Sequence, residues 1–162
     1  MAHIPDLAEG ADVDRSLTLR LLLLLPAIAL GLKIFGFRRL YLFLLHHSRL
    51  PLSKTEAVQD AASQAERLAA AVVCVNRRIL PYESRCLLES LVLLWVLRRA
   101  GIPAELFLGV RTIMGPFEAH AWVEYDGRVL NDDDGVRGVY ETFDLRSLHA
   151  CATRDDPQAQ MI

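Results

Sequence analysis

Three residues of the types that cooperate in thiol catalysis follow one another along the chain, at Cys86, His120 and Asp132. A nucleophilic cysteine needs a thiolate, an imidazole within hydrogen-bond reach of it, and a carboxylate that fixes the imidazole tautomer. The acid follows the histidine by 12 residues, across an Asp-Gly turn signal that can fold one strand back on the other. The three residues therefore predict nucleophilic acyl chemistry.

Each of these residues also has a simpler explanation when it is taken singly. A cysteine near a helix start is often a core thiol, a strand histidine is often half-buried, and a turn aspartate is usually solvated. Zinc binding fits less well, because one Cys, one His and one Asp form no close pair of ligands. The joint order favours catalysis, and we expect neither a metal nor a cofactor.

The cysteine lies at the start of an apolar helix that we expect over residues 86–100. Ser84 is a suitable N-cap, Gly101 occupies the position that ends a helix, and Pro103 prevents its continuation. The helix body is apolar nearly all round, which is typical of a central helix. At the second helical position, free N–H groups and the helix dipole stabilise a thiolate and lower the pKa of Cys86. The backbone N–H of Cys86 is the natural oxyanion donor.

Strand-like alternation replaces the helical period after this helix. We expect strands at 105–112, 119–125 and 128–132, a loop around 114–118, and a further strand at 139–143. Helices followed by strands with short turns indicate an α+β fold, in which N-terminal helices precede an antiparallel β-meander.

The length of the hairpin loop decides which aspartate faces the histidine, because a one-residue slip turns every side chain to the other face of the sheet. A two-residue loop at 126–127 places His120 opposite Asp133. A three-residue loop at 125–127 places His120 opposite Asp132 instead.

We favour the three-residue loop, which pairs Glu124 with Arg128, because Gly127 suits a bulge position that needs positive φ. In this register Trp122, Glu124 and Leu130 share the face of His120 and Asp132, whereas Ala121, Val123 and Asn131 lie on the other face.

Charged residues are unevenly distributed along the chain, and the N-terminal third is strongly apolar. Residues 1–14 carry four acids and no base, residues 15–50 carry six bases and no acid, and the remainder contributes −4 to the net charge of −2. Leu21–Leu32 is an unbroken run of 12 apolar residues or glycine, shorter than a membrane span usually requires. Packing on the domain or on a partner, contact of residues 15–48 with a membrane surface, and a true span all remain open.

The remaining features indicate an ordinary globular domain. At 162 residues, 52% of them hydrophobic and 23% charged, the chain can bury a single core, and its net charge argues against nucleic-acid binding. A capping box, Ser53 to Glu56, begins an amphipathic helix expected over 54–76. The chain has three cysteines, Cys74, Cys86 and Cys151. Their number and spacing match no disulfide framework and no CxxC metal site, which indicates a reducing, cytoplasmic setting. We expect Cys74 to be a buried, inert thiol.

Around the candidate triad the sequence resembles the transglutaminase-like leader peptidases of lasso-peptide biosynthesis, over about residues 50 to 148. The matching segments are CL at 86–87, SL at 90–91, RRAGIPA at 98–104, LGVR at 108–111, AHAWVE at 119–124 and ND at 131–132. The resemblance implies a transglutaminase-like, papain-like core with Cys86 as nucleophile, His120 as general base and Asp132 as the orienting acid. That assignment also favours the three-residue loop.

The resemblance further implies a function: removal of the leader from a ribosomally made precursor peptide. A separate leader-binding protein and an ATP-dependent macrolactam synthetase, which closes the ring, would then be partners. Fused relatives carry an N-terminal leader-binding domain, so the short helical segment before Pro51 leads us to expect the stand-alone peptidase of a split system. We expect Arg111, Phe117 and Trp122 to contact substrate.

Three segments are expected from these observations. Residues 1–50 form an acidic start and a basic, Leu-rich helical segment, 51–152 form the peptidase core, and 153–162 form a polar tail. The same triad could instead transfer the acyl group to an amine, and a non-catalytic adaptor of a peptide-maturation complex is the other alternative.

Overall fold

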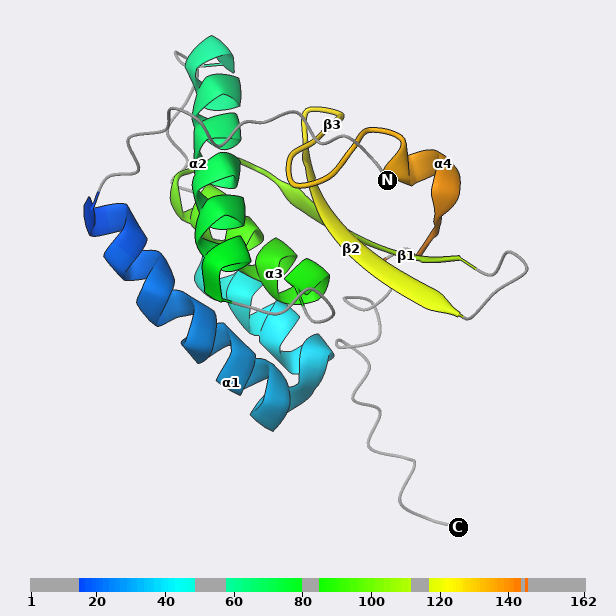
Figure 1. Ribbon diagram of the computed structural model, residues 1–162, viewed down its shortest axis with the longest axis horizontal. Helices are drawn as coiled ribbons and strands as arrows, with labels where there is room; N and C mark the ends of the chain where they lie inside the picture. The colour runs from blue at the N-terminus through cyan, green and yellow to red at the C-terminus, as the bar shows by residue number, and fades with distance from the viewer. Residues whose placement is uncertain (1–14, 49–57, 80–84, 112–116, 144, 146–162) are drawn as a thin grey trace.

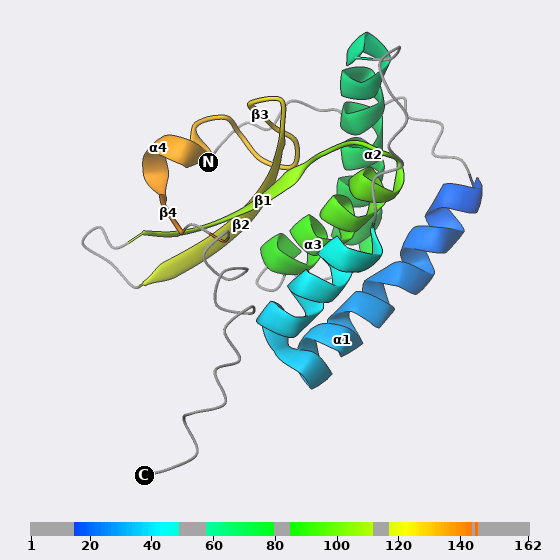
Figure 2. The same cartoon turned by 180° about the vertical axis from the view of Figure 1, so that it is seen from behind.

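The computed structural model describes residues 15–48, 58–79, 85–111, 117–143 and 145, drawn in Figures 1 and 2. Several features considered above lie outside the described residues: the acidic segment 1–14, the Ser53–Glu56 capping box, the Ser84 cap, residues 114–116 of the predicted loop, Cys151 and the tail 153–162.

The first helix, α1 (Arg15–His47), is a helical hairpin. Gly36 has a φ of 73° and a ψ of 169°, a conformation that side chains with a Cβ rarely adopt, and the chain doubles back there. The two limbs lie side by side in both ribbon views (Figures 1 and 2). A Cβ placed on Gly31 in the first limb would lie 3.1 Å from the side chain of Leu40 in the second, so the limbs are in contact.

The segment Leu17–His47 is long and apolar enough to cross a membrane by length and composition, a property that core helices and signal sequences share. In the structure one side of it is packed against the protein, since Leu21, Leu25 and Ile28 are buried. Of the three alternatives for this segment, packing on the domain is therefore correct for its inner face.

Two further helices agree closely with their sequence patterns. The helix expected over 54–76 is described as α2 (Val58–Ile79), and the next is α3 (Arg85–Arg99). Gly101 has a φ of 83°, and the N–H of Ile102 donates to the carbonyl of Leu97 at 2.9 Å. This is the glycine-based helix end that the sequence predicts.

Four antiparallel strands form one sheet in the order β3-β2-β1-β4. They are β1 (Glu105–Arg111), β2 (Glu118–Tyr125), β3 (Arg128–Val129) and β4 (Glu141–Phe143). The first three form the expected meander. The fourth does not continue it: after the short helix α4 (Val136–Val139), the chain returns to pair β4 with the far side of β1. The strand predicted from 139 thus begins later, because Val139 belongs to α4.

The predicted hairpin register is wrong. Tyr125 pairs with Arg128, so the loop contains two residues rather than three. Asp126 and Gly127 have φ values of 49° and 72°, the positive pair that a type I′ turn requires and that Asp-Gly supplies at low cost. Glu124 consequently pairs with Val129 rather than with Arg128.

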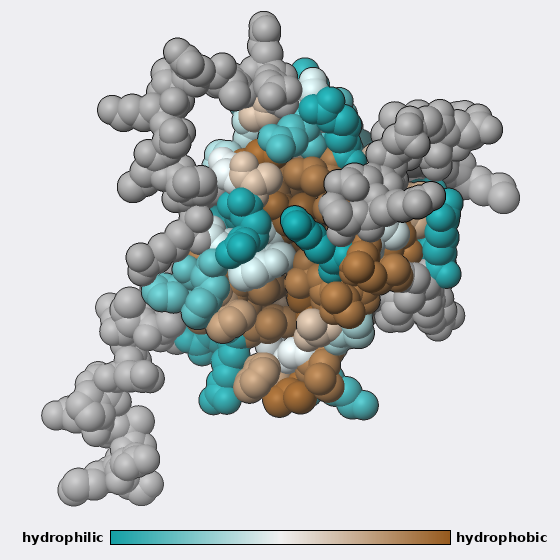
Figure 3. Space-filling view, turned by 90° about the vertical axis from the view of Figure 1, so that its left-hand side faces the viewer, coloured by the Kyte–Doolittle hydropathy of each residue, from teal (hydrophilic) through white to brown (hydrophobic). Residues whose placement is uncertain are grey.

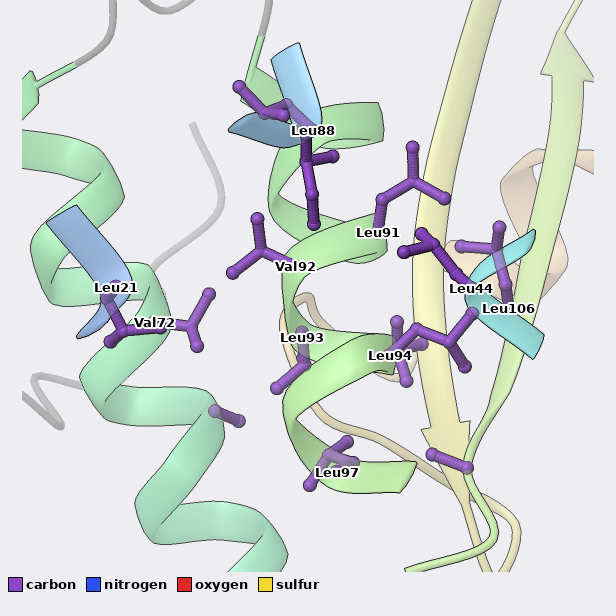
Figure 4. Packing of buried hydrophobic residues seen from close by; sticks show 14 of the residues in the cluster. Leu21, Leu44, Val72, Leu88, Leu91, Val92, Leu93, Leu94, Leu97 and Leu106 are labelled. Carbon is purple, nitrogen blue, oxygen red and sulfur yellow. The ribbon is translucent and has the colours of Figure 1, made fainter. Parts of the chain in front are cut away.

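One hydrophobic core joins the helices to the sheet. Leu91, Leu93 and Leu97 of α3 are fully buried, and burial of each such side chain stabilises the fold by roughly 2 kcal/mol. The surrounding residues labelled in Figure 4 include Leu21 and Leu44 from α1, Val72 from α2 and Leu106 from β1. Residues before and after position 50 therefore share this core. The division of the chain at residues 50 and 152 into three segments stays a prediction.

Candidate active site

Cys86 is the second residue of α3, in the turn whose backbone N–H groups have no partner within the helix. A hydrogen bond with His120 is the strongest influence on its thiol and lowers the pKa of Cys86. Burial opposes that shift, whereas backbone hydrogen bonds at Leu87 and Ala121 reinforce it. The positive end of the helix dipole acts in the same direction. The site thus favours the Cys86 thiolate.

His120 lies in β2 between the thiol and a carboxylate. Its Nε2 contacts Oδ2 of Asp132, and this hydrogen bond is the first of the causes that raise the pKa of His120 to about 9. The hydrogen bond with Cys86 acts in the same direction, and burial opposes both. The two shifts act together: the pair favours a protonated imidazole and a thiol that ionises more readily than usual.

Asp132 remains ionised beside that imidazolium. Burial on its own raises the pKa of Asp132, but hydrogen bonds from His120 and from the N–H of Asp133 outweigh it and lower the pKa. The Asp133 N–H donates to Asp132 Oδ1 at 2.8 Å. One carboxylate oxygen is thus held by the backbone while the other faces the histidine.

Asp132 reaches His120 because the backbone pairing of the hairpin is interrupted after Leu130. The N–H of Leu130 donates to the carbonyl of Val123 at 2.9 Å, as a two-residue hairpin requires. The N–H of Val123 then donates to Asn131 Oδ1 at 2.9 Å, so a side chain replaces the next strand bond. Regular pairing ends there, and Asp132 reaches His120 despite the shorter loop.

Two consequences follow for the predicted faces of this hairpin. Leu130 packs against the hydrophobic core rather than on the face of His120, because it pairs with Val123. Asp133 does not face His120 either: it is exposed, and its Oδ1 accepts the N–H of Gly135 at 2.8 Å.

A buried polar network that sequence reasoning did not identify lies behind the site. Asn131 Nδ2 donates to Ser90 Oγ at 3.1 Å and lies 3.4 Å from Glu89 Oε1. Ser90 Oγ donates to the carbonyl of Ala121 at 3.0 Å, next to His120, and Asn76 Nδ2 donates to Glu89 Oε2 at 2.7 Å. The network ties α2, α3, β2 and the Asp132 turn together. The Glu89-Ser90 pair, polar within an otherwise apolar helix, was the available signal.

Aromatic rings pack against the histidine. The Tyr140 ring stacks on His120 with centroids 5.1 Å apart, and the Trp122 ring lies 6.1 Å from it. Trp122 has no exposed surface, and its indole N–H donates to Glu124 at 2.8 Å. The prediction that Trp122 contacts substrate is therefore wrong: its ring fills the space behind His120.

The other two predicted substrate contacts lie at the surface. Arg111, at the end of β1, forms an ion pair with Glu118 on β2, and its guanidinium lies 5.4 Å from the centre of the Tyr140 ring. Because Tyr140 stacks on His120, Arg111 is connected to the site through one side chain. Phe117 is 69% exposed immediately before β2. Contact of Arg111 and Phe117 with substrate stays a prediction.

Two further kinds of site were considered in the sequence: a second thiol, at Cys74, and a metal centre. Cys74 is free and half-buried, less enclosed than the predicted core thiol. Within the described ranges, no group of three His, Cys, Asp or Glu side chains is placed to hold a metal ion.

Comparison with known proteins agrees with this fold. Residues 22–143 match the profile of the transglutaminase-like superfamily, so the chain belongs to that superfamily. The matched range contains the described fold from the first limb of α1 to β4.

A curated relative is the microcin J25-processing protein McjB of Escherichia coli, which is 43% identical over 56 residues. That alignment covers 35% of this chain and 26% of the relative, so the chain spans about a quarter of the length of the protein it matches. No solved structure matches.

Proposed function

We propose that the protein is a cysteine peptidase that removes the leader from a lasso-peptide precursor. The observation that carries the proposal is the Cys86 thiol hydrogen-bonded to His120, whose ring also contacts Asp132. Membership of the transglutaminase-like superfamily and the local similarity to a microcin-processing protein support the choice of a peptide substrate.

In the acylation step, Cys86 Sγ attacks the carbonyl carbon of the last leader residue. The carbonyl π electrons move to oxygen, and the N–H of Cys86 at the start of α3 donates to that oxyanion. When the tetrahedral intermediate collapses, the C–N bond breaks and His120 gives its proton to the departing amine. The products are the leader thioester on Cys86 and the core peptide with a free amino terminus.

Hydrolysis then regenerates the site. A water oxygen attacks the thioester carbon while His120 accepts one of its protons, and the C–S bond breaks to release the leader as a carboxylic acid. Cys86 leaves as a thiolate beside the protonated His120. Asp132 keeps the ring oriented and its positive charge stabilised throughout both steps.

The proposal includes three partners: the precursor peptide, a separate leader-binding protein and a macrolactam synthetase. It places the reaction in a reducing cytoplasm, without nucleic acid. The basis for these partners is the similarity of the site segments to lasso-peptide leader peptidases.

A single incubation tests the reaction type. The protein is mixed with a candidate precursor and its leader-binding protein in ¹⁸O-labelled water, and the products are analysed by mass spectrometry. We expect a shortened core peptide and a leader whose new carboxyl group carries one ¹⁸O atom. A leader joined to an amine without ¹⁸O would indicate acyl transfer, and an unchanged precursor would indicate an adaptor; either result contradicts the proposal.

A further inference from the structure

The outer surface of the α1 hairpin is apolar, and the rest of the described protein does not cover it. Along the first limb, one stripe of exposed side chains points away from the core, with Leu23 at 69% and Leu30 at 58% exposure. Figure 3 views the side of the molecule that carries α1 and shows a broad apolar surface there. Contiguous apolar surface of this kind marks an interaction site.

The stripe continues to the turn of the hairpin. Ile34 and Phe35, the two residues before Gly36, are 62% and 58% exposed. A side chain at Gly36 itself would meet nothing within 4 Å, so the turn projects into open space. Exposed apolar side chains therefore extend along the first limb up to the turn.

All the charged side chains that flank this turn in the sequence are basic. Lys33 precedes Ile34, and Arg38 and Arg39 lie near the start of the second limb; all three are exposed. No Asp or Glu occurs anywhere in residues 15–48. An apolar projection whose neighbouring charges in the sequence are all positive complements anionic lipid headgroups, which attract the charges while the apolar side chains enter the acyl boundary.

We infer that the α1 hairpin docks the protein on an anionic lipid bilayer, with Ile34 and Phe35 inserted at the interface. The protein lies on the membrane and does not span it. The first limb, residues 15–35, is 21 residues long and reaches roughly 31 Å, about the thickness of a hydrocarbon core. Its inner face, however, includes Leu21 and Leu25, which are held in the common core, so the limb cannot leave the protein without opening that core.

Co-sedimentation with sucrose-loaded vesicles tests this inference on the full chain. We expect binding to equal parts of phosphatidylglycerol and phosphatidylcholine, little binding to phosphatidylcholine alone, and loss of binding at high salt. The Ile34→Ser/Phe35→Ser variant should bind at least about tenfold more weakly, because it removes the inserted apolar area. Phe143→Ser, which changes a side chain of 55% exposure on β4, is the matched control and should bind normally.

A second variant keeps the test decisive if the first is poorly folded. Arg38→Gln/Arg39→Gln changes only exposed charges and should weaken binding to anionic vesicles about fivefold per arginine, roughly 25-fold together. Failure of the wild-type chain to sediment, or undiminished binding of both variants, would overturn the inference. Capture by the leader-binding protein or self-association through the hairpin, without vesicle binding, would also overturn it. Each of these outcomes is independent of peptide cleavage.

Discussion

The side chain of Asn131 accepts the backbone N–H of Val123 at 2.9 Å, in place of the main-chain acceptor that an uninterrupted hairpin would supply. Because this side-chain oxygen takes the place of a backbone carbonyl, the regular pairing of β2 with the following strand ends here. It also determines which of three consecutive aspartates meets the histidine, because Asp132 turns to His120 while Asp133 closes the next turn.

Replacement of the paired carboxylate should therefore impair turnover selectively. We expect Asp132→Asn to lower the cleavage rate by at least about a hundredfold, because the amide does not stabilise the imidazolium. Asp133→Asn should have little effect, since an amide oxygen can still accept the Gly135 N–H. Rates measured with a mass-spectrometric cleavage assay would contradict this assignment if the two variants behaved in the opposite way.

Asn131 should matter for stability as well as for turnover. Asn131→Ala leaves the N–H of Val123 without its acceptor and removes a donor to Ser90, and we expect a loss of about 1–3 kcal/mol in the free energy of unfolding. Asp134→Ala is the control: it removes two exposed contacts, one with the Val129 N–H at 3.4 Å and one with the Arg137 guanidinium at 3.9 Å, and should change stability by less than about 0.5 kcal/mol. Urea unfolding measures both, and equal losses would argue against a special role for Asn131.

The close approach of Tyr140 to the sheet depends on Gly109. A Cβ at this position would lie 2.7 Å from Tyr140 Cβ and 3.1 Å from two atoms of the Trp122 ring. Gly109→Ala should destabilise the protein by about 1–3 kcal/mol and lower the cleavage rate, because both displaced rings pack on His120.

Gly138→Ala is the matched control for that change, since a Cβ there meets nothing within 4 Å. Thermal unfolding of the two variants should differ clearly. If Gly109→Ala were as stable and as active as Gly138→Ala, the packing of Tyr140 would not position the histidine.

The pH dependence of cleavage follows from the two shifted groups. Activity should rise as the Cys86 thiol, whose pKa is lowered, becomes a thiolate, and it should fall as His120 loses its proton near pH 9. Asp132→Asn should move the alkaline limb to lower pH, because the hydrogen bond with Asp132 is the first cause of the raised pKa of His120.

Iodoacetamide labelling of Cys86 distinguishes the two limbs of this profile. Alkylation requires only the thiolate, so it should rise with the acid limb and persist above pH 9 while cleavage declines. An alkylation rate that first rises only near the ordinary pKa of a thiol, about 8.5, would contradict the ion pair.

Much of the fold follows from local sequence signals. Gly101 and Pro103 mark the end of α3 because few other residues permit that geometry, and Asp126-Gly127 marks the hairpin turn for the same reason. The sequence places Cys86 at the start of this helix because Ser84 is a suitable N-cap, and Cys86 is indeed the second residue of α3. Such features depend on a few adjacent residues, which is why a single sequence reveals them.

Features that depend on distant contacts were harder to predict. Counting along the strand makes a two-residue loop and a His120–Asp132 pair mutually exclusive, because the count assumes regular pairing. The side chain of Asn131 interrupts that pairing. The return of β4 to β1 requires α4 and the space above Gly109. Neither the burial of Trp122 nor the reversal of α1 at Gly36 has a local signature strong enough to settle it beforehand.

The cleavage rate of Cys86→Ala measures the central claim most directly, with Cys74→Ala as the matched control. Both variants are incubated with precursor and leader-binding protein, and the released core peptide is quantified by mass spectrometry over time. The proposed mechanism predicts no cleavage above background by Cys86→Ala and a normal rate for Cys74→Ala, with both variants folded by circular dichroism. Cleavage by Cys86→Ala at the wild-type rate would contradict it.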